Sequence, residues 1–259
     1  MNNTQKLGLP MEYQEKPEYF DAHNMNESTE SKNAFIEKLL KAQNVKTVLD
    51  MTCGTGSQVF YLAKRGYEVK GSDFSPGLLE RARKKAAAEG LDLTFVDGDM
   101  RSLKVGQFDA VITIFNAIGH LVKPDFEKAL QNIHSNLKDG GVYIFDIFNL
   151  QAITDDNIAD FEMDIENTVN GVKIRKVQHS EVDRENELLT SHDRHTILKN
   201  GCEPETYTNS FSLQIYTAEQ LQAMLEQTGF EIIHRYDMEG NDFIADKSLT
   251  MLTIARKKA

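Results

Sequence analysis

The chain has 259 residues, a length that predicts one large domain or one domain that carries a long insertion. Apolar residues make up 40% and charged residues 27% of the chain, which is typical of a globular protein and excludes a disordered or fibrous one. The formal net charge is −11, and the densest basic cluster, at 81–85, is typical of a solvated helix face. We therefore expect no nucleic-acid partner, because an acidic surface repels a phosphate backbone.

The two cysteines, Cys53 and Cys202, are too far apart in the sequence to indicate a disulfide framework or a four-ligand zinc site. His192 and His195 are three positions apart in an extended stretch and would point to opposite faces, so we expect no metal. No stretch reaches the roughly 18 apolar residues that a membrane span needs, and the N-terminal residues lack the apolar run of a signal peptide. We expect a cytoplasmic protein with no membrane partner.

The first half of the chain alternates between predicted helices and strands. Apolar spacing predicts a helix over 31–41 and a buried strand over 47–49, and a glycine loop at 54–56 leads into a second helix that stops at Gly66. A strand over 67–71, a helix from Pro76 to Gly90 and a strand over 93–96 follow. The apolar run 110–115 is typical of a strand buried on both faces, and 124–137 and 142–145 predict a helix and a fifth strand. This alternation predicts a doubly wound α/β domain with a mostly parallel sheet.

The pattern changes after Asn149. Two Asn-Gly pairs, at 170–171 and 200–201, lie between extended segments, and Asn-Gly tolerates the positive φ of a type I′ turn. We therefore predict an antiparallel insertion of about four strands with its middle turn near Asn186. Thr217 and Gln220 predict a capping box for a helix over 217–227, and 231–236 and 249–255 predict the last two strands. The expected divisions are an N-terminal arm (1–30), a core (31–150), the insertion (151–213) and a C-terminal return to the core (214–259).

The segment Asp50-Met51-Thr52-Cys53-Gly54-Thr55-Gly56 lies between the first strand and its helix. Glycines allow a ligand to approach the backbone there, at the carboxyl end of a strand, where open sheets bind cofactors. Asp73 ends the second strand, where a carboxylate accepts hydrogen bonds from ribose hydroxyls or, alternatively, caps the next helix. The pattern predicts a nucleotide-like cofactor. Val59 replaces the third glycine of the dinucleotide fingerprint, and no Walker lysine follows the glycines.

The acid-x-x-x-G-x-G loop, the acid that ends the second strand and the Gly98-Asp99-Met100 turn together resemble the class I S-adenosylmethionine-dependent methyltransferases. The resemblance covers 45–150 and 217–257. It implies a Rossmann-like, doubly wound, seven-stranded methyltransferase sheet with S-adenosylmethionine as cofactor. Asp50 and the loop would line the methionine end, Asp73 the ribose, and Asp99 the adenine edge. The full set of cofactor-binding residues is Asp50, Cys53, Gly54, Gly56, Asp73, Phe74, Asp99, Met100 and Phe115, with Phe74 and Met100 on the adenine faces and core packing as an alternative for Met100.

The segment Phe115-Asn116-Ala117-Ile118-Gly119-His120-Leu121 follows the fourth strand. It resembles the N-x-x-x-H-L segment of glycine and sarcosine N-methyltransferases, and the run 98–101 is similar to that of macrolide-sugar N,N-dimethyltransferases. Both groups methylate amines, so the resemblance implies N-methylation of a small molecule. His120 would orient the substrate or act as a base, with a structural role as the alternative, and Asn116 would hold the substrate or the methionine end of the cofactor.

Aromatic residues of the arm, Tyr13, Tyr19 and Phe20, resemble the lid that such enzymes fold over the cofactor, and we place Tyr19 among the catalytic residues. Phe148 stands where glycine methyltransferases carry an arginine for the substrate carboxylate, which argues against glycine itself. The alternatives are a small-molecule O-methyltransferase, a non-catalytic S-adenosylmethionine-binding protein, and a nicotinamide-dependent oxidoreductase, which Val59 disfavours. The insertion could also join copies of the chain in a homo-oligomer.

Overall fold

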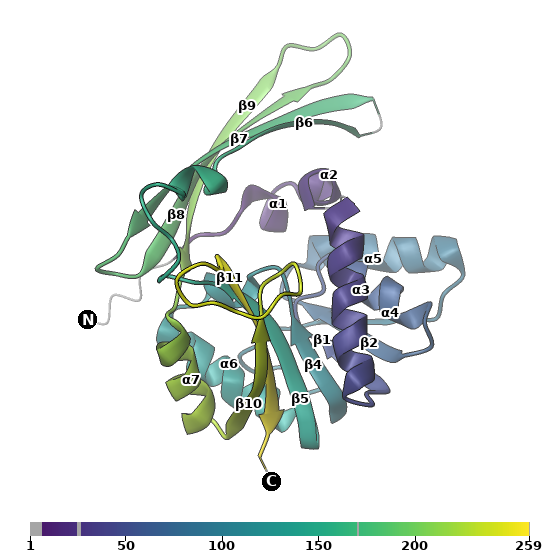
Figure 1. Cartoon of the computed structure of the whole chain (residues 1–259). Coiled ribbons are helices and arrows are strands. Elements are labelled where there is room, and N and C mark those ends of the chain that lie inside the picture. Colours follow the sequence, from purple (N-terminus) through teal and green to yellow (C-terminus); the bar gives the residue numbers. More distant parts are fainter. Residues whose placement is uncertain (1–6, 25–26, 170, 259) are drawn as a thin grey trace, which may run out of the picture.

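A computed structural model describes residues 7–24, 27–169 and 171–258. Seven strands form the main sheet in the order β10-β11-β5-β4-β1-β2-β3 (Figure 1). The strands β5, β4, β1, β2 and β3 run parallel, and β11 is antiparallel to both of its neighbours. Their bounds are β1 Thr47–Asp50, β2 Glu68–Asp73, β3 Thr94–Asp97, β4 Phe108–Thr113, β5 Leu137–Phe148, β10 Phe230–Tyr236 and β11 Thr250–Lys257. The predicted seven-stranded, doubly wound α/β class is confirmed.

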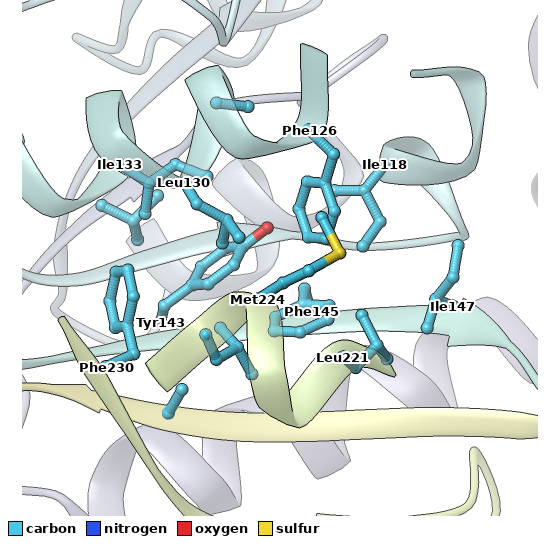
Figure 2. Packing of buried hydrophobic residues seen from close by; sticks show 14 of the residues in the cluster. Ile118, Phe126, Leu130, Ile133, Tyr143, Phe145, Ile147, Leu221, Met224 and Phe230 are labelled. Atoms are coloured by element: carbon cyan, nitrogen blue, oxygen red, sulfur yellow. The ribbon is translucent and has the colours of Figure 1, made fainter. Parts of the chain in front are cut away.

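Helices cover both faces of this sheet because successive strand residues point to opposite sides. Val48 packs with α3 (Glu27–Ala42) and α4 (Ser57–Ala63), whereas its neighbour Leu49 packs with α6 (Lys123–Ser135) and α7 (Ala218–Gln227). On this second face, Figure 2 shows side chains of α6 and α7 meeting Tyr143 and Phe145 of β5, whose rings stack with centroids 4.6 Å apart. The remaining long helix, α5 (Pro76–Glu89), packs beside α4 around Phe95.

Local signals set the helix ends as the sequence predicts. The Ser75 side chain accepts a hydrogen bond from the Leu78 N–H at the start of α5, and Gly90 ends that helix in the left-handed region. Thr217 and Gln220 form the predicted capping box at the start of α7. Among the described residues, no helix combines the length and the hydropathy that a membrane span requires.

A second sheet of four antiparallel strands, in the order β6-β7-β8-β9, joins β5 to α7. Its strands are β6 Met163–Val169, β7 Val172–Asp183, β8 Leu188–Leu198 and β9 Glu205–Gln214, and the short 3-10 helix η3 (Ile158–Phe161) precedes them. The predicted antiparallel insertion with its middle turn near Asn186 is therefore present. The second Asn-Gly pair lies in a longer connection, because β8 ends at Leu198 and β9 begins only at Glu205.

Several predicted strand bounds differ from the observed ones, and two of the differences have identifiable reasons. The fourth strand ends at Thr113 instead of 115, because Phe115 and Asn116 adopt positive φ angles of 64° and 56° and turn the chain out of the sheet. The fifth begins at Leu137 instead of 142, because Leu137 already pairs with Phe108. Gly140, which has a positive φ of 73°, lies at the irregularity in register between this pair and the next pair, Ala110 with Val142.

The N-terminal arm lies between the two sheets in Figure 1. It contains α1 (Met11–Gln14), the 3-10 helix η1 (Pro17–Tyr19) and α2 (Phe20–Asn24). On the core side, Thr55 Oγ1 donates to Asp21 Oδ1 at 2.6 Å. On the insertion side, Asn209 Nδ2 donates to the Leu9 carbonyl at 2.9 Å. The arm is therefore bonded to both units.

Candidate active site

Two cavities lie where the core, the arm and the insertion meet. The core cavity, about 850 Å³, is lined by the loops that follow β1, β2 and β3, together with Tyr13 and Phe20 of the arm. The insertion cavity, about 860 Å³, is lined by the second sheet, by Phe148 at the end of β5 and by the loop 237–250. Three residues line both cavities: Tyr13, Phe115 and His120.

Asp73 ties the glycine loop to the end of β2. Its Oδ2 accepts a hydrogen bond from the Gly54 N–H at 2.8 Å, and its Oδ1 accepts one from the Ser75 N–H at 2.9 Å. Burial raises the pKa of this carboxyl to about 6, and the backbone hydrogen bonds oppose that shift. The side chain that caps the start of α5 is that of Ser75, so Asp73 is not the helix cap that the sequence left open as an alternative.

Seven of the nine predicted cofactor-binding residues line the core cavity: Cys53, Gly54, Asp73, Phe74, Asp99, Met100 and Phe115. Phe74 and Phe115 are 41% and 39% exposed, so two aromatic rings face open space at this cavity. The Asp99 carboxylate accepts a hydrogen bond from Arg101 Nε at 2.9 Å, and this contact lowers its pKa.

Gly56 and Asp50 do not line the core cavity. A Cβ at Gly56 would lie 2.8 Å from the Phe60 ring, and the backbone there has a positive φ of 93°. Both the packing against Phe60 and the backbone conformation therefore require glycine at this position. Asp50 is buried beneath the loop, where its Oδ1 accepts a hydrogen bond from the Thr52 N–H at 3.2 Å. Burial raises the pKa of Asp50 to about 8.

The left-handed turn after β4 carries Asn116. Its N–H donates to Asp146 Oδ2 at 3.0 Å, and its Oδ1 accepts from the Phe148 N–H at 3.0 Å. The Nδ2 atom is buried and has no hydrogen-bond partner among the described residues, and Asn116 lines the insertion cavity. A Cβ at Gly119 would lie 2.5 Å from this Nδ2, so Gly119 makes room for the amide. Phe115 and Asn116 are consecutive non-glycine residues at positive φ, a costly conformation that the surrounding structure must hold in place.

His120 lies in the 3-10 helix η2 (Ala117–His120) at the junction of the cavities. Its ring contacts Tyr13 of the arm and Phe211 of β9, with centroids 5.3 Å and 5.9 Å away. Its Nδ1 is buried, and no residue in the described part of the chain forms a hydrogen bond with it. Burial lowers the pKa of His120 to about 4, so the imidazole is neutral at neutral pH.

The structure does not bring Tyr19 to the site. Tyr19 lines neither cavity and packs against Ile174 and Ile197 of the second sheet. Tyr13, and not Tyr19, lines both cavities. Phe20 lies against Gly54, and a Cβ at Gly54 would be 3.3 Å from the Phe20 ring. Short helical turns in the arm decide which aromatic residue faces inward, and no periodicity in the sequence reveals this.

A buried cluster of four charged or titratable residues joins the arm to the insertion: Glu12, Lys176, Asp193 and His195. The Lys176 ammonium lies 3.0 Å from Asp193 Oδ2 and 3.6 Å from Glu12 Oε1, and His195 faces the same two oxygens at 3.6 and 3.9 Å. Glu12, Asp193 and His195 are close enough together to hold a metal ion. However, Lys176 already places a cation between the carboxylates.

Residues 48–141 match a family model described as a methyltransferase domain. The glycine/sarcosine N-methyltransferase of Parasynechococcus marenigrum is 34% identical over 52% of this chain and 49% of its own length. The dTDP-3-amino-3,4,6-trideoxy-alpha-D-glucopyranose N,N-dimethyltransferase of Streptomyces venezuelae is 29% identical over 40% of this chain and 43% of its own length. The chain therefore spans about half the length of these two relatives. The Bacillus subtilis protein YqeM, which carries a provisional methyltransferase name, is 27% identical over 75% of this chain and 77% of its own length.

Solved structures share the fold over nearly the whole chain. The sugar N-methyltransferase KedS8 from Streptoalloteichus has a TM-score of 0.78 at 16% identity, over 98% of this chain and 94% of its own. An S-adenosylmethionine-dependent methyltransferase from Clostridium acetobutylicum has a TM-score of 0.76 at 18% identity, over 94% and 97%. The matched domain model spans β1 to β4 and the glycine loop of the core cavity. Residues 48–141 therefore match a methyltransferase domain, and the chain as a whole shares its fold with solved S-adenosylmethionine-dependent methyltransferases.

Proposed function

We propose that the chain methylates the nitrogen of a small-molecule amine, with S-adenosylmethionine in the core cavity and the amine in the insertion cavity. The observation that carries this proposal is the pair of cavities that meet at Tyr13, Phe115 and His120. A methyl transfer needs two ligands whose reacting atoms are in contact and aligned, and adjoining cavities with a shared wall provide that.

The residues of the core cavity fit a cationic nucleoside. The described charged residues that line it are four carboxylates, Glu15, Asp73, Asp99 and Asp125, and one cation, Arg101. Such a balance favours a positively charged ligand. Asp73 would bind the ribose, Phe74 and Met100 the adenine faces and Asp99 its amine, while Cys53, Gly54 and Phe115 would line the methionine end. The bound cofactor supplies a methyl group on a cationic sulfur.

His120 would orient the amine at the shared wall. A neutral imidazole can accept a hydrogen bond from an amine N–H and hold the lone pair toward the methyl group. Its low pKa favours this orienting role over that of a strong base. An acceptor that enters as its ammonium first loses one proton to water. Its lone pair then forms the new N–C bond while the S–C electron pair stays on sulfur, and a second proton leaves the methylated nitrogen for water. Asn116 Nδ2 offers a donor to an oxygen of the acceptor.

Two observations favour nitrogen over oxygen as the acceptor. The described residues that line the insertion cavity include five carboxylates and three lysines, so the cavity is acidic and attracts a cationic amine. Two of the three relatives reported above also carry the names of N-methyltransferases. O-methylation and binding without turnover are the outcomes against which the proposal is tested.

The test combines binding and turnover. Calorimetry with S-adenosylmethionine, S-adenosylhomocysteine and NAD identifies the cofactor, and we expect binding of the first two only. Release of S-adenosylhomocysteine is then screened over amines, amino acids, phenols and sugars. Turnover confined to hydroxyl compounds would refute N-methylation, and tight cofactor binding with no turnover over the whole panel would favour a binding protein.

The variant His120→Asn tests the orienting role. We expect kcat to fall by about 100-fold, a typical size for a polar group that contacts the reacting atoms, with the Kd for S-adenosylmethionine within threefold. If turnover of the identified acceptor is unchanged across pH, the role assigned to His120 is wrong.

A further inference from the structure

The insertion cavity contains an apolar wall that begins at His120. Phe211, whose ring centroid lies 5.9 Å from that of His120, is followed by Leu213 on the same face of β9. Phe161 and Phe148 continue the wall, with their rings in an edge contact at 5.1 Å. A ligand whose nitrogen meets His120 would therefore lay the rest of its body along apolar side chains.

Exposed apolar side chains gather at the two cavities. The five large apolar residues that are most exposed among the described ones are Phe74, Phe115, Met163, Leu198 and Ile244. Four of them line a cavity, and Met163 and Ile244 line the insertion cavity, where they are 37% and 49% exposed. Exposed apolar surface that is concentrated at a concave site marks a surface which a ligand covers.

The insertion cavity has few groups that could bind a carboxylate beside the acceptor nitrogen. The described residues that line this cavity include no arginine, and their three lysines are Lys32, Lys176 and Lys247, of which Lys247 is exposed on the loop 237–250. Lys176 faces two carboxylates, those of Glu12 and Asp193, at 3.6 and 3.0 Å, so its positive charge is already balanced. Lys32 lies over the Phe115 ring at 5.6 Å, and its positive charge opposes the rise that burial causes in the pKa of Asp146.

The size of the insertion cavity also favours an acceptor larger than glycine or sarcosine. A volume of about 860 Å³ lies in the upper part of the range of about 300–1,000 Å³ that is usual for sites holding drug-sized ligands. Glycine or sarcosine would leave most of this space to water and leave the apolar wall uncovered.

We propose, building on the function proposed above, that the acceptor is an amine on an extended apolar or aromatic body that carries no carboxylate beside the nitrogen. The apolar wall and the two exposed side chains at its mouth select this body. The acidic residues of the cavity favour its ammonium form on approach.

The first experiment measures kcat/KM for S-adenosylhomocysteine release with glycine, sarcosine, and primary alkylamines of two to eight carbons. Each methylene that the wall buries should raise kcat/KM about fourfold until the wall is covered. Phenethylamine is compared with phenylalanine, which differs from it only by the carboxylate, and should be the better acceptor by at least tenfold. Binding of hexylamine and of glycine to the enzyme saturated with S-adenosylhomocysteine is measured in parallel by calorimetry.

Surface variants then locate the effect. Met163→Ser and Ile244→Ser should each lower kcat/KM for octylamine by about tenfold and leave the Kd for S-adenosylmethionine unchanged. Leu198→Ser is the matched control, because Leu198 is 39% exposed and lines neither cavity, and it should change neither value. All three residues are exposed, so the substitutions leave the buried core intact.

The outcomes separate this inference from the function on which it rests. A preference for glycine or sarcosine over the alkylamines would overturn the inference and leave N-methylation standing. Equal kcat/KM across chain lengths, or a loss in Leu198→Ser as large as that in Ile244→Ser, would also overturn it. Cofactor binding with no amine turned over, at any chain length, would refute the proposed function itself.

Discussion

The cluster of Glu12, Lys176, Asp193 and His195 predicts that Lys176→Met destabilises the fold strongly. The Lys176 ammonium is buried and lies 3.0 Å from Asp193 Oδ2 and 3.6 Å from Glu12 Oε1. Both carboxylates are buried, since the side chains of Glu12 and Asp193 are 1% and 0% exposed. Removing the cation therefore leaves two buried carboxylates with much less compensation, and breaking a buried pair in this way costs about 3–5 kcal/mol. Methionine keeps most of the side-chain volume, so the loss measures charge and not packing.

The matched control lies on the same strand. Lys173 pairs with Glu166 at 3.3 Å, but the two side chains are 59% and 54% exposed. Solvent screens such a pair, so Lys173→Met should cost less than about 1 kcal/mol. Both variants are measured by urea unfolding followed by circular dichroism at pH 7.

A double variant separates the charge effect from a general loss of fit. Adding Glu12→Gln to Lys176→Met removes one of the two uncompensated carboxylates, so the double variant should be more stable than the sum of the single losses predicts, by about 0.5–3 kcal/mol. If Lys176→Met costs no more than Lys173→Met, the reasoning about buried charge is refuted.

Three further predictions concern the site and its buried carboxyls. Tyr13→Phe should lower kcat or the affinity for S-adenosylmethionine, whereas Tyr19→Phe should leave both unchanged in steady-state and calorimetric measurements, because only Tyr13 lines the cavities. Gly119→Ala should displace the Asn116 amide, which a Cβ would approach to 2.5 Å, and lower kcat at least tenfold while the circular dichroism spectrum is unchanged. Burial raises the pKa of Asp50 from 3.8 to about 8, so the folded state holds its proton more tightly than the unfolded state does. Without cofactor, the free energy of unfolding should therefore fall as the pH rises from about 4 to about 8. Asp50→Asn should make the free energy of unfolding, measured with urea, depend less on pH over this range. An unchanged pH dependence would contradict the raised pKa.

Local signals in the sequence predicted much of the fold. The capping box at Thr217 and the turn near 186 involve residues that are neighbours along the chain, so a short stretch of sequence specifies each of them, whereas the predicted turn at Asn170 lies outside the described residues. The left-handed turn at Phe115 and Asn116 was missed because the apolar run 110–115 indicates a continuous strand, although asparagine tolerates positive φ. It is held by contacts to Asp146 and Phe148, about 30 positions away in the sequence.

The site was predicted in part, for the same reason. Residues of the glycine loop and of the β2 and β3 ends lie at one edge of the sheet because of the topology, and most of them line the core cavity. The burial of Asp50 and the packing role of Gly56 depend on side chains from other elements and are not visible in the motif. The charged cluster at Lys176 joins positions 12 and 193, which only the folded chain brings together. The cytoplasmic location, the domain divisions and the homo-oligomer stay predictions.

The wall shared by the two cavities has a consequence for inhibition. Tyr13, Phe115 and His120 face both spaces, so two ligands bound there would lie end to end. A single molecule that joins a nucleoside to an amine through a short linker would place its second half at a millimolar effective concentration once the first half is bound. Such a compound should bind 100-fold or more tightly than either half. Its affinity would also measure how well the two cavities are aligned.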